Sequence, residues 1–131
     1  LSPDITRGQG MVIEAVLTFL LVFVIFATAM DAKRALQKFT GFVAGLALSA
    51  GVLVAFPFTG GSMNPARTFG PAVVTRHWEN HGVYWVGPLL GGILASVVYD
   101  RFFLRDQHPG STGAPLPSDE TANRSPAGFR R

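Results

Sequence analysis

The chain has 131 residues, of which 48% are hydrophobic and 15% are charged, and its formal net charge is +3. It contains no cysteine, which excludes disulfide bonds and metal sites built on thiolates. Its basic residues are spread over short connectors and a C-terminal tail rather than gathered in one stripe, so no nucleic-acid partner is predicted. The distribution of apolar residues along the chain is therefore more informative than the overall composition.

Three long apolar runs predict three membrane-spanning helices. Residues 11–30 carry a single charge, Glu14, whereas residues 39–58 and 82–99 carry none. About 20 apolar residues are needed to cross the hydrocarbon core of a bilayer as a helix. The second helix must end before Pro57, because proline disfavours helical structure in the residue that precedes it. We therefore expect helices over about 11–30, 39–56 and 83–103.

The polar segments predict how the chain crosses the membrane. The connector 31–38 contains three basic residues, and the segment 105–131 is rich in Pro, Gly, Ser and charge, which is typical of a disordered tail. Cytoplasmic loops carry an excess of Lys and Arg. We therefore expect the connector and the tail to face the cytoplasm, and residues 1–10 and 75–81 to face outside. A chain that begins outside with no preceding helix suggests a fragment of a longer protein.

The segment FTGGSMNPARTFGPA, residues 58–72, lies between the second and the third apolar run. Asn64 is a good helix N-cap and Pro65 is favoured at a first helical position, so a short half-helix is expected within about 58–75. Irregular backbone at membrane depth occurs only where protein covers it or where it lines a water-filled cavity. The segment is therefore either an external loop or a re-entrant loop at a pore. Arg67 would be a solvated charge in the first case and would mark a substrate pathway in the second.

Several motifs, taken together, resemble the aquaporin (major intrinsic protein) family. NPAR, preceded by GGSM and followed by TFGPAVV, resembles the second signature loop of that family, while GQGMVIEAVLTFLLVF and HGVYWVGPLLGGILASVVYD resemble its fourth and sixth membrane helices. The resemblance covers about residues 8–103 and matches only the second half of the six-span family pattern. It implies an all-α membrane protein over residues 1–104, an aquaporin-like half-hourglass with three transmembrane helices and one re-entrant half-helix, without a cofactor or a bound metal.

The resemblance also assigns roles to the residues of the segment 58–72. The side-chain amide of Asn64 would donate to a passing water molecule, and Arg67 would form the outer constriction. Glu14 would accept hydrogen bonds from the loop backbone and hold it, although the residue by itself also fits a charge placed near a helix N-terminus. The remaining members of the signature complete the NPA motif or would supply carbonyls along the approach: Pro65, Ala66, Gly60, Gly61, Ser62 and Met63.

The constriction differs from that of a strict water channel. Val52 stands where such channels commonly have histidine, and Gly61 would add room, so ammonia, urea or hydrogen peroxide is expected to pass beside water. Four other positions favour the water-type branch over the glycerol-type branch: Thr68, Ala72, Tyr84 and Trp85. The resemblance thus implies a passive water channel. The alternatives are an aquaglyceroporin, or a truncated non-conducting membrane protein that interacts with full-length subunits.

The remaining polar and aromatic residues have simpler interpretations. His77 and His81 flank Glu79, but they lie in a connector and are expected to be solvated rather than to bind a metal. Trp78, Tyr84 and Trp85 are expected to anchor the chain at the membrane interface. Five glycines are expected to permit close helix packing: Gly41, Gly45, Gly87, Gly91 and Gly92.

An enzyme within the membrane is not predicted, because the apolar runs contain no cluster of Asp, Glu or His. The partners implied by the resemblance are water, possible small neutral solutes, the lipid bilayer and further copies in a homotetramer of the full-length protein. The plasma membrane is the expected location, with an intracellular membrane as the alternative.

Overall fold

The computed structural model describes residues 1–30 and 36–104, so the predicted disordered tail over 105–131 lies outside the described residues. These described residues form helices and contain no strand. Three helical segments are long and apolar enough to cross a membrane, which confirms the all-α, three-span prediction. The principal helices are α1 (Arg7–Ala29), α2 (Thr40–Ala55), α3 (Pro65–Thr75) and α4 (Val83–Tyr99), with a 3-10 turn at Gln37–Phe39 before α2 and a π-helical turn at Asp100–Leu104 after α4.

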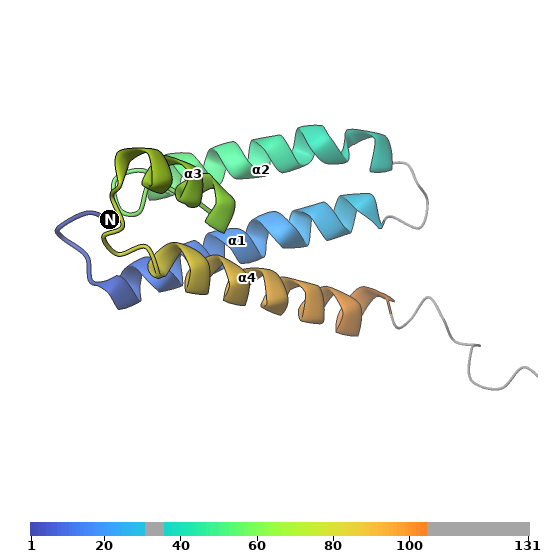
Figure 1. The fold of residues 1–131 in the computed structure, drawn as a ribbon. Coiled ribbons are helices and arrows are strands. Elements are labelled where there is room, and N and C mark those ends of the chain that lie inside the picture. Colours follow the sequence, from blue (N-terminus) through green and yellow to red (C-terminus); the bar gives the residue numbers. More distant parts are fainter. Residues whose placement is uncertain (31–35, 105–131) are drawn as a thin grey trace, which may run out of the picture.

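Helices α1, α2 and α4 lie side by side and form the body of the molecule (Figure 1). The first residues and the connection from α3 to α4 lie at the same end, where the Arg7 Nε donates to the Asn80 Oδ1 at 2.7 Å. The beginning of α2 and the end of α4 lie at the opposite end (Figure 1). Residues 1–10 and 75–81 therefore share one end, as a three-span chain requires. Which side of the membrane that end faces stays a prediction.

Helix α1 begins four residues before the position expected from hydropathy. A capping box explains the earlier start, because the Thr6 hydroxyl accepts from the Gln9 amide at 3.2 Å and the Gln9 Oε1 accepts from the Thr6 amide at 2.8 Å. The added turn is polar, so a search for apolar residues passes over it. The cap, rather than the membrane, sets where this helix starts.

Two glycines bring α4 into close contact with α1. A Cβ atom on Gly87 would lie 2.8 Å from the Glu14 Cβ, and a Cβ atom on Gly91 would overlap the carbonyl oxygen of Ala15. Without side chains, these positions let the two backbones approach. The predicted packing role is therefore confirmed for Gly87 and Gly91, and their contact fixes α4 against the part of α1 that carries Glu14.

The other three glycines differ from these two. Gly41 and Gly45 pack against no described residue, and a Cβ atom on Gly92 would meet only the Val22 side chain at an ordinary contact distance of 3.9 Å. For Gly41 and Gly45, the predicted packing role has no partner among the described residues, so it stays a prediction.

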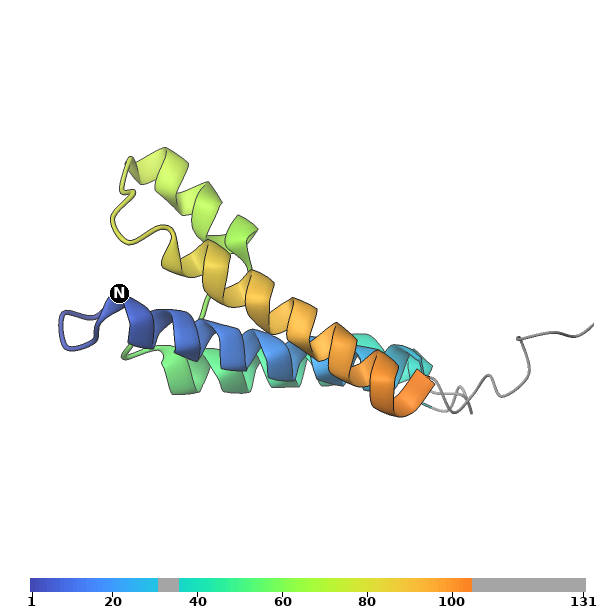
Figure 2. The same ribbon diagram turned by 90° about the horizontal axis from the view of Figure 1, so that it is seen from below.

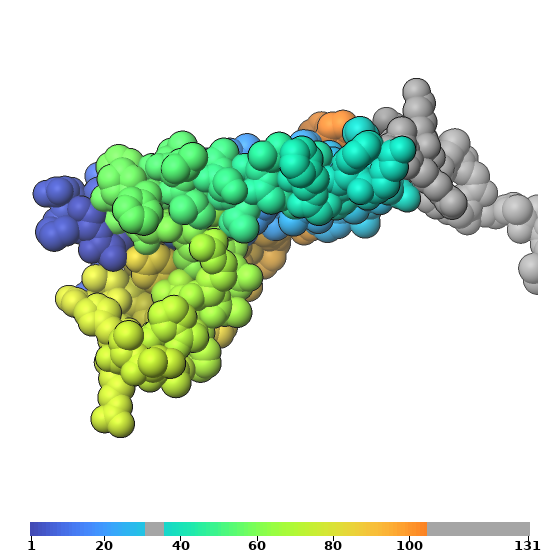
Figure 3. All heavy atoms as spheres, turned by 90° about the horizontal axis from the view of Figure 1, so that it is seen from above, coloured from blue at the N-terminus to red at the C-terminus, as the bar shows by residue number. Residues whose placement is uncertain are grey.

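Helix α3 stands apart from the body formed by α1, α2 and α4. It runs at an angle to the other helices (Figure 2), and in the space-filling view α3 and the connector after it project from that body (Figure 3). Its described contacts are with α4 alone among the helices, and they are few. The position of α3 therefore depends on the loop that precedes it and on the ring contacts of Phe69 with Trp78 and with Trp85 at the start of α4.

Candidate functional site

The loop between α2 and α3 enters the body of the molecule instead of staying at its end. Thr59 lies beside Gly10, near the start of α1, whereas the amides of Ser62 and Met63 reach Glu14, about one turn further along that helix. The chain then turns at Asn64, and α3 leads back toward the end from which the loop came (Figure 2). Of the two possibilities that the residues left open, this path into the helical body fits the re-entrant one, and its place in a membrane stays a prediction.

Glu14 holds the deepest part of this loop. Its Oε1 accepts from the Ser62 amide at 2.9 Å and its Oε2 accepts from the Met63 amide at 2.7 Å, while its side chain is completely buried. Hydrogen bonds to a carboxylate are stronger than neutral ones, and a buried carboxylate needs them. Glu14 lies about two turns inside α1, beyond the reach of the helix N-terminal charge. The interpretation of Glu14 as a helix-terminal charge is therefore wrong.

The same loop packs closely against the last turn of α2. A Cβ atom on Gly61, whose φ is +63°, would lie 2.8 Å from the Cα of Val52. One residue earlier, the Met63 side chain fills the space where a Cβ atom on Gly51 would stand, with its Sδ 2.8 Å away. Val52 and Gly61, the two positions expected in the constriction, are thus in direct contact. The absence of a side chain at Gly61 lets the loop approach α2, a role beyond the widening that the resemblance implies.

Asn64 forms the cap of α3. Its backbone is extended, with a φ of −158°, and its Oδ1 accepts from the Ala66 amide at 2.9 Å, while Pro65 occupies the first helical position. Because the side-chain oxygen is used within the helix, the amide group of Asn64 is the part left to donate to another molecule. The cap thereby fixes which end of the side chain points outward.

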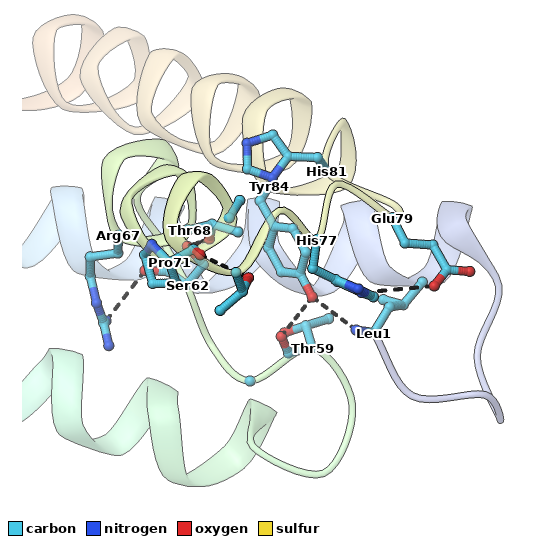
Figure 4. A pocket seen from close by; sticks show the side chains of 13 residues that line it. Leu1, Thr59, Ser62, Arg67, Thr68, Pro71, His77, Glu79, His81 and Tyr84 are labelled. Atoms are coloured by element: carbon cyan, nitrogen blue, oxygen red, sulfur yellow. Dashed lines mark hydrogen bonds and ion pairs between the residues drawn. The ribbon is translucent and has the colours of Figure 1, made fainter.

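Arg67 lies on the first turn of α3 and folds back over the loop. Its Nη1 donates to the carbonyl oxygens of Ser62 and Gly61 at 3.3 and 3.4 Å. In the close view, the guanidinium points away from Tyr84 and His77 (Figure 4). The structure therefore brings Arg67 and two of the four expected carbonyls to one side of the loop.

A second set of contacts joins the loop to α3. The Ser62 Oγ donates to the Asn64 carbonyl at 2.7 Å and lies 2.5 Å from the Thr68 Oγ1. Serine has a single hydroxyl proton, which already goes to Asn64, so Thr68 must be the donor to Ser62. The sequence marked Thr68 only as a position that separates family branches. No local pattern indicates that it closes the loop onto the helix.

Tyr84 is not the interfacial anchor that the sequence predicts. It is only 8% exposed, and its hydroxyl donates to the Thr59 carbonyl at 2.9 Å. Trp78 and Trp85, by contrast, are 49% and 42% exposed. Tyr84 was missed because aromatic residues near the end of a span usually mark the interface, and only the fold shows that this one faces the loop.

A polar cavity of about 330 Å³ opens beside the loop, between it, α3 and the connector that leads to α4 (Figure 4). This volume holds several water molecules, since each occupies about 30 Å³ in the liquid. Hydroxyl groups from the loop and from two helices line the cavity, so its wall beside the loop is polar. The hydroxyl-bearing residues in its lining are Thr59, Ser62, Thr68, Thr75 and Tyr84.

The chain matches the family described as "Major intrinsic protein" over residues 1–99. The chain belongs to this family. It is 49% identical to Aquaporin TIP4-4 of Zea mays over 121 residues, which are 92% of this chain and 46% of that protein. It is 48% identical to Aquaporin-4 of Rattus norvegicus over 106 residues, which are 79% of this chain and 32% of that protein. The chain thus spans about half, or less, of the length of these curated relatives.

Membership in the major intrinsic protein family, together with three apolar helices, makes the chain part of an integral membrane protein. The similar proteins are named as aquaporins, which are channels rather than enzymes.

The histidines of this major intrinsic protein occupy two different environments. His77 is exposed and lies 3.7 Å from Glu79, as expected of a solvated connector. His81 is not solvated as predicted: its ring lies 4.9 Å from that of Trp78 and 6.3 Å from that of Phe69, and its Nε2 is buried. The fold brings these rings together because α3 and the connector pack over the start of α4. No group of three potential metal ligands occurs among residues 1–30 and 36–104.

Proposed function

We propose that the protein is a passive, bidirectional channel for water and that the described residues form one wall of its pore. The observation that carries this proposal is the meeting of three features on one re-entrant loop. These features are the capped N-terminus of α3 at Asn64, the carbonyls of Gly61 and Ser62, and the guanidinium of Arg67 above them. The osmotic or concentration gradient drives the flow, so neither a cofactor nor a covalent step is needed.

The chemistry of these groups suits water and opposes cations. Aligned peptide dipoles give the N-terminus of α3 a partial positive charge, and the Asn64 amide adds a donor at the same place. The carbonyls of the loop accept hydrogen bonds along the approach. A water molecule that passes between such donors and acceptors is oriented, while the positive charge of Arg67 and of the helix end opposes protons and other cations.

The side chains at the constriction favour small neutral solutes beside water. Val52 is apolar and lies against Gly61, so this wall offers no imidazole to a passing molecule. We therefore include ammonia, urea or hydrogen peroxide among the proposed solutes. The aquaglyceroporin alternative is less well supported. Thr68 donates a hydrogen bond to the Ser62 hydroxyl, whereas the ionised aspartate of glycerol-type members could not donate one there.

The proposal is tested by reconstituting the full-length protein in liposomes and following their shrinkage by light scattering after an osmotic step. The expected water permeability lies well above that of protein-free liposomes, with no accompanying proton leak. A permeability equal to that of protein-free liposomes, for protein shown to be inserted, would contradict it. A non-conducting protein that acts on full-length subunits would instead lower the permeability of an aquaporin reconstituted with it.

We further propose that the full-length protein is a homotetramer in the plasma membrane. The resemblance to the family supports the assembly. Cross-linking in native membranes tests the number of subunits, and membrane fractionation distinguishes the plasma membrane from an intracellular one.

A further inference from the structure

Tyr84 is connected to Arg67 through the loop by a run of three hydrogen bonds. The Tyr84 hydroxyl donates to the Thr59 carbonyl at 2.9 Å. The Gly61 amide donates to the Thr59 hydroxyl at 3.1 Å, and the Gly61 carbonyl accepts from the Arg67 Nη1 at 3.4 Å. The run begins on α4, which lies on the far side of the loop from the Arg67 guanidinium (Figure 4).

Thr59 is the residue on which this run depends. Its carbonyl accepts a hydrogen bond from Tyr84 on α4, and its hydroxyl accepts one from the Gly61 amide. The loss of either hydrogen bond therefore interrupts the connection. Thr59 and Tyr84 are 6% and 8% exposed. Hydrogen bonds shielded from water are stronger than exposed ones, and losing one partner leaves a buried polar group unpaired.

Few other hydrogen bonds hold the segment that this run crosses, although Gly61 also packs against Val52 of α2. Glu14 binds the amides of Ser62 and Met63, which lie beyond it along the chain. Gly60 and Gly61 have φ angles of +83° and +63°, a region open to glycine, and beyond its chain neighbours no described residue lies within 4 Å of the place that a Cβ atom on Gly60 would occupy. The Ala55 carbonyl accepts from the Thr59 and Gly60 amides, but the Thr59 carbonyl is held by Tyr84.

We propose that Tyr84 is a positioning residue for the constriction: its hydroxyl orients Thr59, which orients Gly61 and, through the Gly61 carbonyl, the guanidinium of Arg67. Phenylalanine at this position fills the same space but breaks the first link. The consequence for solute discrimination rests on the proposed channel function, whereas the positioning itself does not. The two parts are therefore tested separately.

Amide hydrogen exchange of the full-length protein tests the positioning. Tyr84→Phe is expected to speed exchange at the Gly61 amide roughly two- to tenfold, the effect of losing one hydrogen bond. Exchange at the Met63 amide, which Glu14 holds, stays as in the wild type. The control is Tyr99→Phe, which removes the hydroxyl of the other buried tyrosine of α4; within the described residues that ring packs on Phe26 and Phe103. Equal exchange at Gly61 in Tyr84→Phe and Tyr99→Phe would overturn the proposal.

The ratio of urea to water permeability in liposomes tests the consequence. Tyr84→Phe and Thr59→Val, which removes only the hydroxyl of Thr59, are each expected to raise this ratio roughly two- to tenfold. Because the links are in series, the double variant is expected to match the larger single effect. Thr59→Ser keeps both groups and restores the ratio.

Two results of that experiment would overturn the role in discrimination. One is a ratio in Tyr84→Phe equal to that in Tyr99→Phe, and the other is a double variant whose effect is the product of the single effects. If the wild type conducts no water, the proposed function fails, and amide exchange at Gly61 still decides whether Tyr84 positions the loop.

Discussion

The carboxylate of Glu14 accepts a hydrogen bond from the amide of Met63 at 2.7 Å, although 49 positions of sequence separate the two residues. The second carboxylate oxygen accepts from the neighbouring amide of Ser62. A charge buried in a membrane span is costly unless it is paired or hydrogen-bonded. This one carboxylate therefore connects a transmembrane helix to the deepest part of the re-entrant loop, and the geometry of the candidate pore wall depends on it.

Replacing Glu14 by glutamine is expected to weaken that connection. Glutamine keeps the shape but has one acceptor oxygen and an amide group, which would face a backbone donor. The loss of a charged hydrogen bond in a buried site is expected to cost about 2 kcal/mol. The measurement is the thermal unfolding midpoint of the full-length protein in detergent, which should fall. Glu79→Gln, at a side chain that is 71% exposed, serves as the control and should leave the midpoint in place.

The contact between α1 and α4 gives a second prediction. Gly91→Ala places a Cβ atom against the Ala15 carbonyl and is expected to destabilise the fold by about 1–3 kcal/mol, since backbone cannot move aside as a side chain can. Gly92→Ala makes the same change one residue later, where the nearest side-chain atom is 3.9 Å away. Both changes raise helix propensity equally, so a lower midpoint for Gly91→Ala than for Gly92→Ala isolates the contact. Equal midpoints would show that α1 and α4 do not pack this closely.

The contact between the loop and α3 gives a third. Thr68→Val removes the hydrogen bond that Thr68 donates to Ser62 and leaves the volume of the side chain almost unchanged. The free energy of unfolding is therefore expected to fall by about 1 kcal/mol. Thr68→Ser retains the hydroxyl and should behave as the wild type in the same unfolding measurement. If the serine and valine variants have the same unfolding midpoint, the hydroxyl does not join the loop to the helix.

Hydropathy was sufficient to predict the three spans, because each apolar run is close to the length that a bilayer requires. It was insufficient for the start of α1, where a capping box between Thr6 and Gln9 adds a polar turn. The cap of α3 could be predicted because it is local. Asn64 caps the helix and Pro65 occupies its first position, and neither role requires a distant partner.

The path of the loop could not be predicted from its own residues. Glycine, proline and a single arginine suit an external loop as well as a re-entrant one, and the contact that decides between them joins Glu14 to Met63 across 49 positions. Tyr84 and His81 were missed for the same reason. Tyrosine is common near membrane interfaces and histidine suits a polar connector, and only the packing of the loop and of α3 over α4 turns these two residues inward.

The central claim is that the capped end of α3 lines a water pore, and Asn64→Asp tests it most directly. Aspartate caps a helix as well as asparagine does, so the unfolding midpoint should stay in place while the amide donor is lost and a negative charge is added. We predict that wild-type liposomes shrink much faster than protein-free ones, and that Asn64→Asp liposomes shrink more slowly than the wild type and leak protons. Equal shrinkage rates for Asn64→Asp and the wild type, without a proton leak, would contradict the claim.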